Sequence, residues 1–165
     1  MKSQGKIEIA LVDDHALMRD ALANVIDEFD NCCVSLRCDN GKHLIESLNN
    51  NIIPDVIILD INMPLMDGYE TAKWIKENFP NIHIIILTMF DSEIALIRLL
   101  QLGVKAFLKK DTHPGELLLA IRSVMENGYY YSQNSSGKLA NVFQNPNKNF
   151  SAQPTLLTNN EITFI

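Results

Sequence analysis

The sequence predicts an α/β protein built on a doubly wound parallel sheet with helices on both faces. Five short apolar runs recur along the chain, and segments with helical periodicity separate them. Two of the runs contain almost only Ile, Val and Leu, which is typical of strands that are covered on both faces. Strict alternation of strand and helix favours parallel strands joined by crossover helices.

The predicted strands correspond to the five apolar runs. The third and fourth runs are the nearly uninterrupted ones. In chain order the runs are Ile7–Val12, Cys33–Arg37, Val56–Leu59, Ile82–Leu87 and Ala106–Leu108.

Five amphipathic helices are predicted from apolar residues at helical spacing. The fourth, Glu93–Leu102, has the least regular pattern. The predicted buried faces of the others are Leu17, Ala21, Val25 and Phe29 in the first, Leu44, Ile45 and Leu48 in the second, Ala72, Ile75 and Phe79 in the third, and Leu117, Ala120, Ile121 and Val124 in the fifth.

Helix start and stop signals support these boundaries. Asp91 and Ser92 precede the fourth predicted helix as N-cap candidates, and Gly103 follows its end. Pro114 lies in the first turn of the fifth predicted helix, and Gly128 ends that helix.

Composition restricts the class of protein. The 165 residues are 47% hydrophobic and 21% charged, enough to bury a real core, and the net charge of −6 argues against a nucleic-acid or anionic-membrane surface on this chain. The three cysteines form no zinc pattern, so we expect reduced thiols. No signal-peptide pattern and no apolar run of bilayer length is present, so we expect a soluble, cytoplasmic protein.

The composition changes near residue 131. Beyond it the sequence is rich in Asn, Ser and Gln, and no acidic residue occurs between residues 132 and 155. We therefore divide the chain into a domain over residues 1–130, a linker over 131–155 and the start of a further domain over 156–165. Thr158 and Glu161 have the spacing of a capping box at a helix start.

Acidic residues follow two of the predicted strands. Asp13 and Asp14 close the first run, and Asp60 follows the third. Ligands of open parallel sheets bind beyond the carboxyl ends of the strands, where the strand order reverses. In a flavodoxin-like sheet of order 2-1-3-4-5 that point lies between the first and third strands. We therefore expect the three carboxylates to share one pocket.

The residue types in this pocket indicate a specific chemistry. Neighbouring carboxylates repel one another unless a cation lies among them, and oxygen ligands favour Mg²⁺, or Mn²⁺, over zinc. Thr88 ends the fourth run with a hydroxyl, and Lys109 and Lys110 follow the fifth with an ammonium group. Acids, hydroxyl and amine at these strand ends predict phosphoryl transfer to a carboxylate.

Four segments carry a resemblance to a known family. They are LVDDH at residues 11–15, ILDINMPLMDG at 58–68, ILTMFD at 86–91 and GVKAFLKKD at 103–111. Over residues 6–130 the chain resembles the receiver domain of two-component response regulators. The resemblance implies a phosphoacceptor signalling domain, not a turnover enzyme, which assists its own phosphorylation and dephosphorylation.

The resemblance also implies a metal site and a phosphoacceptor. Asp60 is expected to accept the phosphoryl group. Mg²⁺ is expected to bind to Asp13, Asp14 and Asp60 and to the backbone carbonyl of Asn62.

Three further residues match the family's switch positions. Thr88 is expected to be the switch hydroxyl, Phe107 the switch aromatic residue and Lys110 the lysine that contacts the phosphoryl group. Two departures stand out: Asp111 occupies a position where the family often has proline, as in many members with helix-turn-helix output domains, and Phe107 lacks the hydroxyl of the common tyrosine.

Simpler roles compete for some of these residues. Asp14 could cap the first helix instead of binding metal, although we favour metal. His15 is interpreted as a surface residue at the start of the first helix, not a ligand, and His83 and His113 as core or surface residues without a catalytic role. The extra apolar residues of the fourth and fifth helices indicate either deep packing or an interaction surface.

The resemblance extends to partners and output. The terminal segment LLTNNEITFI resembles the start of a LuxR/NarL-type helix-turn-helix domain. The resemblance to the family implies phosphorylation by a sensor histidine kinase or phosphotransfer protein. It also implies a homodimer through helix four, strand five and helix five, DNA binding only through the missing C-terminal domain, and no membrane partner.

The main alternative is a stand-alone receiver that controls a protein partner. A phosphohydrolase is disfavoured because Asn62 stands where those enzymes have a second aspartate.

Overall fold

The computed structural model describes residues 5–89 and 92–131. Its helices and strands alternate along the chain as predicted. They are β1 (Ile7–Val12), α1 (Ala16–Asp27), β2 (Cys32–Cys38), α2 (Gly41–Asn49), β3 (Val56–Leu59), α3 (Gly68–Asn78), β4 (His83–Thr88), α4 (Glu93–Gln101), β5 (Ala106–Lys109), α5 (Pro114–Asn127) and β6 (Tyr130–Tyr131).

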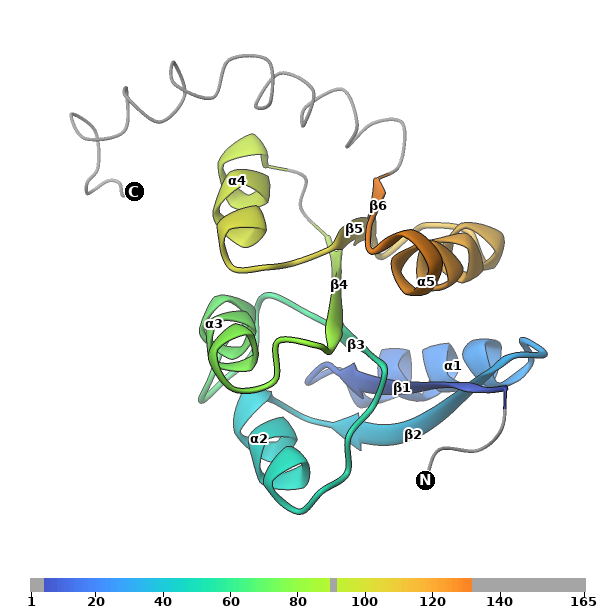
Figure 1. Ribbon diagram of the computed structural model, residues 1–165, viewed down its shortest axis with the longest axis horizontal. Coiled ribbons are helices and arrows are strands. Elements are labelled where there is room, and N and C mark those ends of the chain that lie inside the picture. The colour runs from blue at the N-terminus through green and yellow to red at the C-terminus, as the bar shows by residue number, and fades with distance from the viewer. Residues whose placement is uncertain (1–4, 90–91, 132–165) are drawn as a thin grey trace. The chain divides into compact units, whose positions relative to one another are not determined.

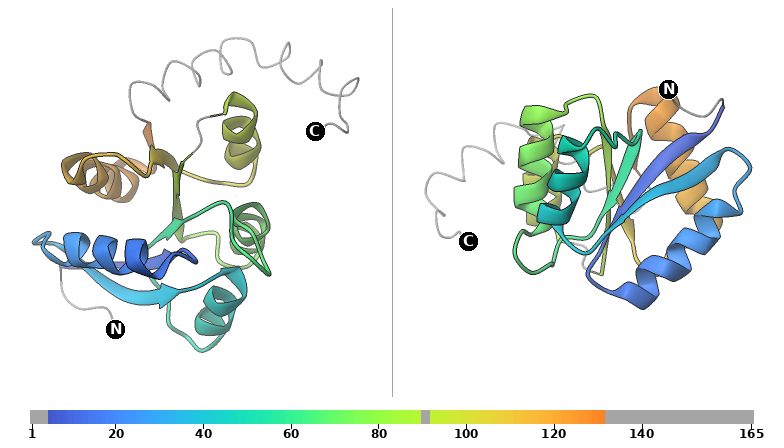
Figure 2. Two further views of the ribbon diagram at one scale, coloured as in Figure 1. Left: turned by 180° about the vertical axis from the view of Figure 1, so that it is seen from behind. Right: turned by 90° about the horizontal axis from the view of Figure 1, so that it is seen from below.

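The sheet is parallel throughout, with the order β2-β1-β3-β4-β5-β6. The predicted order of the first five strands is therefore confirmed, and β6 is an addition. Helices α2, α3 and α4 cover one face of the sheet, and α1 and α5 cover the other (Figures 1 and 2). Each face has its own buried cluster of apolar side chains.

The predicted buried face of α1 is wrong for Leu17 and Ala21, which are exposed, although Phe29 packs against the core as predicted. Leu17 is 88% exposed, whereas Ala23 and Ile26 are fully buried, with Leu22 packed partly against them. Two apolar series with i, i+4 spacing run along this helix, because Leu17, Ala21 and Val25 form one and Met18, Leu22 and Ile26 the other. Periodicity alone could not choose between them, and the packing of α1 on β1 turns the second series inward.

The other predicted helix faces are confirmed, except that Ile45 of α2 is only partly buried; Phe79 is the C-cap residue of α3. The side chain of Ser92 accepts a hydrogen bond from the Ala95 N–H and so caps α4, whereas Asp91 lies outside the described residues. Gly128 ends α5 in the left-handed conformation with φ +90°.

The sixth strand was not predicted, and it contains Tyr131, the first residue of the predicted linker. Tyr130 and Tyr131 pair with Ala106 and Phe107 of β5. A strand of two residues is too short to show an alternating pattern, so no periodic signal predicts it. The rest of the predicted linker and the predicted segment 156–165 lie outside the described residues. No helix among the described residues is long and apolar enough to span a membrane.

The segment that joins β3 to α3 is held close to the end of β3. The Gly68 N–H donates to the Ile61 carbonyl oxygen at 2.7 Å. A Cβ atom on Gly68 would lie 2.6 Å from the backbone oxygen of Asp60 and 2.7 Å from the Ile61 Cα. Asp67 and Glu70 form a capping box that fixes the start of α3. Only glycine allows α3 to begin this close to Asp60.

We predict that Gly68→Ala lowers the free energy of unfolding by about 1–3 kcal/mol, because the added methyl must displace backbone. Urea denaturation of the two proteins would measure the difference. Gly115→Ala in α5 is the matched control, since nothing lies within 4 Å of its Cβ position. That control should be neutral or stabilising by up to about 1 kcal/mol. Equal stability of Gly68→Ala and the wild-type protein would contradict the close approach.

Candidate functional site

Two acidic residues lie side by side at the carboxyl ends of β1 and β3. These strands are neighbours in the sheet, and Val12 and Leu59 are partners in register. The next residues, Asp13 and Asp60, are 8% and 6% exposed. The Asp60 N–H donates to the Val12 carbonyl oxygen at 3.0 Å, so the sheet ladder itself positions the second acid.

Lys110 connects these two acids. It follows β5, and its N–H donates to the Thr88 carbonyl oxygen at 2.8 Å. Its Nζ lies 3.1 Å from Asp13 Oδ2 and 3.3 Å from Asp60 Oδ2, and its side chain is 5% exposed. Of the two lysines in the predicted site, Lys110 is therefore the one that reaches the acids.

Asp14 and His15 complete the cluster from the loop after β1. The His15 Nδ1 lies 3.0 Å from Asp13 Oδ1 and 3.4 Å from Asp14 Oδ1. His15, not Asp14, is the N-cap residue of α1, and its side chain makes no capping hydrogen bond. His15 is exposed as expected, but its contact with both acids was not predicted. The signal was its position directly after the acidic pair.

Burial and charge shift the pKa values of the three connected groups. Burial and the nearby charge of Asp13 raise the pKa of Asp60, and the attraction of Lys110 opposes this only in part. Burial alone would raise the pKa of Asp13, but hydrogen bonds from the His15 N–H and from Lys110 lower it. Burial alone would lower the pKa of Lys110, but Asp13 and Asp60 raise it. The site therefore holds a stable ammonium beside a carboxylate whose ionisation is costly.

The cluster fits a divalent cation. One ligand atom each from Asp13, Asp14, His15 and Asp60 can be chosen so that all lie within 4.8 Å of one another. A cation among them would relieve the repulsion that raises the pKa of Asp60. Carboxylate oxygens are the ligands that Mg²⁺ prefers. Asn62 lies in the loop two residues after Asp60, and the predicted role of its carbonyl stays a prediction.

Thr88 and Phe107 lie on neighbouring strands. Thr88 is the last residue of β4 and is 7% exposed, and Phe107 lies in β5 and is 3% exposed. Ile86 and Phe107 are partners in register, and side chains alternate along a strand, so Thr88 and Phe107 both face the layer of α4.

The ring of Phe107 packs on an aromatic residue that the sequence analysis missed. Its centroid lies 6.2 Å from that of Tyr131 in β6, and Tyr131 in turn lies 5.5 Å from Tyr129. The Tyr130 hydroxyl donates to Glu116 of α5 at 2.9 Å. These contacts attach β6 to the strand that carries Phe107. The run of three tyrosines after Gly128 was the available signal.

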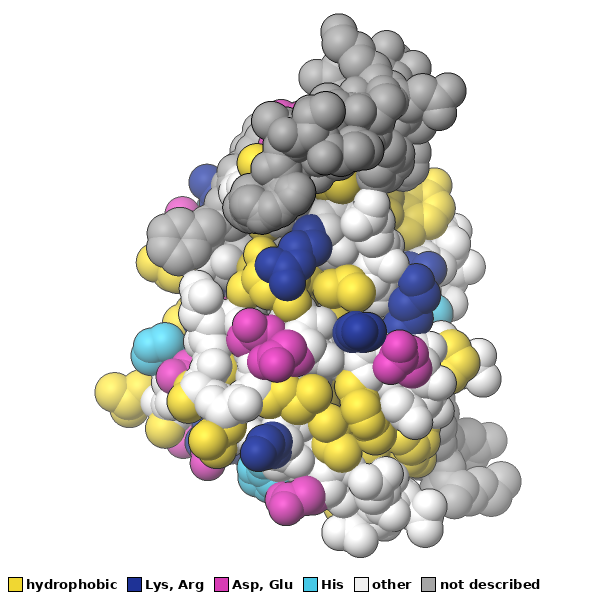
Figure 3. Space-filling view, turned by 90° about the vertical axis from the view of Figure 1, so that its left-hand side faces the viewer, with side chains coloured by type: hydrophobic (Ala, Val, Ile, Leu, Met, Phe, Trp, Pro, Cys, Tyr) yellow, Lys and Arg dark blue, Asp and Glu magenta, His cyan; other side chains and the backbone are white. Residues whose placement is uncertain are grey.

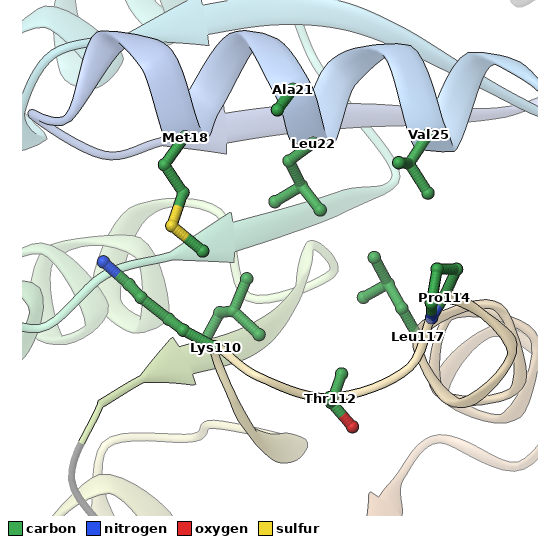
Figure 4. A pocket seen from close by; sticks show the side chains of 9 residues that line it. Met18, Ala21, Leu22, Val25, Lys110, Thr112, Pro114 and Leu117 are labelled. Carbon is green, nitrogen blue, oxygen red and sulfur yellow. The ribbon is translucent and has the colours of Figure 1, made fainter.

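A cavity of about 250 Å³ lies beside the acidic site, between α1 and the start of α5 (Figure 4). Met18, Leu22 and Leu117 contribute apolar walls, and the aliphatic part of Lys110 forms another. The face formed by α2, α3 and α4 carries basic, acidic and apolar side chains intermixed, with no continuous basic area in view (Figure 3). On that face Arg98 of α4 stacks on Tyr69 of α3, 3.9 Å from the ring centroid.

Comparison with known proteins identifies the class. The family model of the response regulator receiver domain matches residues 9–122, which include Asp13, Asp60 and Lys110. The chain belongs to this family. Its fold, with the sheet order of a receiver and the acids at the ends of β1 and β3, agrees with that assignment.

The relatives place the receiver in the LuxR/NarL type. Over 121 residues the chain is 39% identical to the transcriptional regulatory protein YxjL of Bacillus subtilis, and the match covers 73% of this chain and 55% of YxjL. It is 34% identical over 123 residues to the nitrate/nitrite response regulator protein homolog of Haemophilus influenzae, covering 74% and 59%. The chain thus spans little more than half the length of these relatives.

The fold is also similar to that of a LuxR-family two-component response regulator from Aurantimonas, with a TM-score of 0.75 at 22% identity. That likeness covers 82% of this chain and 96% of the other. At this identity the comparison concerns the fold alone.

We predict that Asp60→Asn stabilises the protein at pH 7 without divalent ions, by about 1 kcal/mol. An acid whose pKa is raised by folding binds its proton more tightly in the folded state, so its ionisation above that pKa costs stability. Asparagine keeps the acceptor for the Ile61 N–H and removes the charge. The gain should disappear as the pH falls towards the ordinary value of 3.8, where Asp60 is protonated in both states.

Urea denaturation at several pH values in the presence of a chelator would measure this difference. Asp111→Asn is the control, because Asp111 is exposed and its replacement should change stability by less than about 0.5 kcal/mol. A loss of stability in Asp60→Asn would show that attraction to Lys110 outweighs repulsion from Asp13.

Proposed function

We propose that Asp60 is the phosphoacceptor of this receiver and that the phosphoryl donor is a sensor histidine kinase or a phosphotransfer protein. The observation that carries the proposal is the placement of Asp60 beside Lys110 and the acidic pair. Its carboxylate lies 3.3 Å from the Lys110 ammonium and shares a cation-sized cluster with Asp13 and Asp14. Nucleophile, positive charge and metal ligands thus meet at one point.

Each part of the cluster has a chemical task. A carboxylate oxygen of Asp60 attacks phosphorus, the P–N bond of a phosphohistidine breaks, and its electron pair stays on the imidazole nitrogen, which takes a proton from solvent. Lys110 offsets the negative charge that develops on the phosphoryl oxygens. Asp13, Asp14, Asp60 and the carbonyl of Asn62 would hold Mg²⁺, which supplies charge neutralisation when bound.

Phosphorylation would act on Thr88 and Phe107. The Thr88 hydroxyl moves towards the phosphoryl oxygens, Phe107 fills the space beside β4, and the surface of α4 and β5 changes. The phosphoryl group shifts an existing equilibrium only through its unequal interaction with the two states. Because residue 107 is phenylalanine, packing drives this rearrangement without a phenol hydrogen bond.

The proposed output is control of transcription through a C-terminal DNA-binding domain, with phosphorylation promoting a homodimer through α4, β5 and α5. Of the relatives named above, YxjL is a transcriptional regulatory protein and the Haemophilus influenzae protein is a nitrate/nitrite response regulator homolog, and the chain spans only part of the length of both. Ile94 of α4 and Leu119 of α5 are 65% and 53% exposed, so this face has apolar side chains available for a partner. Gene sequence beyond Ile165 without a helix-turn-helix domain would favour the stand-alone receiver.

Incubation with acetyl phosphate and Mg²⁺ should add one phosphoryl group, detected by mass spectrometry of the intact protein. We expect Asp60→Asn to abolish the addition, because the amide is not a nucleophile for this transfer. Asp67→Asn is the matched control and should be labelled like the wild-type protein, since Asn also caps a helix. Equal labelling of Asp60→Asn would refute the assignment.

A second experiment tests the proposed dimer face. Ile94→Lys should weaken the dimer of the phosphorylated protein at least about tenfold, or 1.4 kcal/mol, by placing a charge in an apolar contact. Analytical ultracentrifugation with and without acetyl phosphate would measure this. Leu17→Lys, an equally drastic change at an exposed site on α1, should leave the dimer unchanged. A dimer that survives Ile94→Lys but not Leu17→Lys would place the interface on α1.

A further inference from the structure

We propose that His15 is a ligand of the metal ion in this receiver, and that its imidazole shifts the site's preference away from Mg²⁺ and towards Mn²⁺ and Co²⁺. The inference rests on the proposed function only in locating the cation among Asp13, Asp14 and Asp60. It adds a nitrogen donor to a site otherwise made of oxygen atoms.

The positions of the donor atoms fit one coordination sphere. Neighbouring ligands on an octahedral ion with bonds of about 2.1 Å lie about 3.0 Å apart, and opposite ligands about 4.2 Å apart. The His15 Nδ1 is 3.0 Å from Asp13 Oδ1 and 3.4 Å from Asp14 Oδ1. All four donor atoms lie within 4.8 Å of one another, so shifts of a few tenths of an ångström would place them around one ion.

The local backbone holds the imidazole at this place. The His15 N–H donates to Asp13 Oδ1 at 2.9 Å, which ties residue 15 to the first acid. His15 is the N-cap residue of α1 in an extended conformation, and its side chain makes no hydrogen bond to the helix. The ring is therefore available to the cluster and not committed to capping. Its 65% exposure leaves room for the small rotation that coordination requires.

The basic side chains around the cluster leave part of its negative charge for a divalent cation to balance. Lys110, which follows β5, contacts the cluster with its ammonium group and already pairs with Asp13 and Asp60. From α1, Arg19 donates to the Asp13 carbonyl oxygen and pairs with Asp39, outside the cluster. The three carboxylates retain net negative charge after Lys110 is counted, and a divalent ion matches it. With such an ion in place, Nδ1 would face the metal as a ligand instead of making its 3.0 Å contact with Asp13 Oδ1.

Ligand chemistry then determines the preference. Mg²⁺ takes oxygen ligands and retains water in place of imidazole. Imidazole binds transition metals well, and affinity rises from Mn²⁺ to Co²⁺. Loss of His15 should consequently lower the affinity for Co²⁺ most, the affinity for Mn²⁺ less and the affinity for Mg²⁺ least. If His15 only makes a hydrogen bond with Asp13, its loss should lower the affinity for all three ions equally.

Pulsed electron paramagnetic resonance of the Mn²⁺-loaded chain gives a direct test. A directly bound imidazole should produce ¹⁴N coupling in the wild-type spectrum, and this coupling should be absent in His15→Ala. His113→Ala is the matched control, because His113 is likewise an exposed N-cap residue without a capping hydrogen bond and should leave the coupling unchanged. A wild-type spectrum without ¹⁴N coupling would overturn the proposal.

Titration with the three metal ions tests the preference itself. His15→Ala should lose about tenfold or more in Co²⁺ affinity and less than about twofold in Mg²⁺ affinity. His15→Asn should not restore Co²⁺ binding, although its amide can still bond to Asp13. Equal losses for all ions, or rescue by asparagine, would overturn the proposal. Because these readouts need no phosphorylation, failure of Asp60 to accept a phosphoryl group would refute the proposed function and leave this inference standing.

Discussion

The contact of the Lys110 ammonium with Asp13 and Asp60 is the interaction on which the rest of the site depends. Two buried carboxylates at neighbouring strand ends repel each other, and Lys110 reaches both at 3.1 and 3.3 Å. The compensation is incomplete, since the pKa of Asp60 is still raised by burial and by the charge of Asp13. This residual repulsion makes the site receptive to a divalent ion, whose positive charge would also offset the negative charge of a phosphoryl group.

The sheet produces this arrangement because β1 and β3 are adjacent although α1, β2 and α2 separate them along the chain. The ladder continues through Asp60, whose N–H bonds to Val12, and Gly68 lets α3 start against the same residue. The loop between them contains Leu65 at φ +68°, a conformation that a non-glycine residue adopts at a cost. A strained loop and a close helix start together fix the carboxylate that they surround.

The sequence was sufficient for the five main strands, for the grouping of Asp13, Asp60 and Lys110, and for the family. Each depends on a signal that repeats, such as apolar runs of strand length or polar residues at several strand ends. The sequence was insufficient where a pattern was ambiguous or where an element was too short to show one. The face of α1 was chosen wrongly because two apolar series compete on that helix, and β6 has only two residues. The contact of His15 with both acids depends on a loop conformation that no periodic pattern encodes.

The sixth strand has a consequence for where this domain ends. The family match stops at residue 122, inside α5, whereas the pairing of Tyr130 and Tyr131 with β5 extends the sheet beyond it. A chain cut at the family boundary would lose the last five residues of α5 and all of β6, and β5 would become the edge strand of the sheet. Its exposed N–H and carbonyl groups would then be free to pair with other molecules, a common route to aggregation. The two tyrosines therefore cover the part of the outer edge of β5 that contains Ala106 and Phe107.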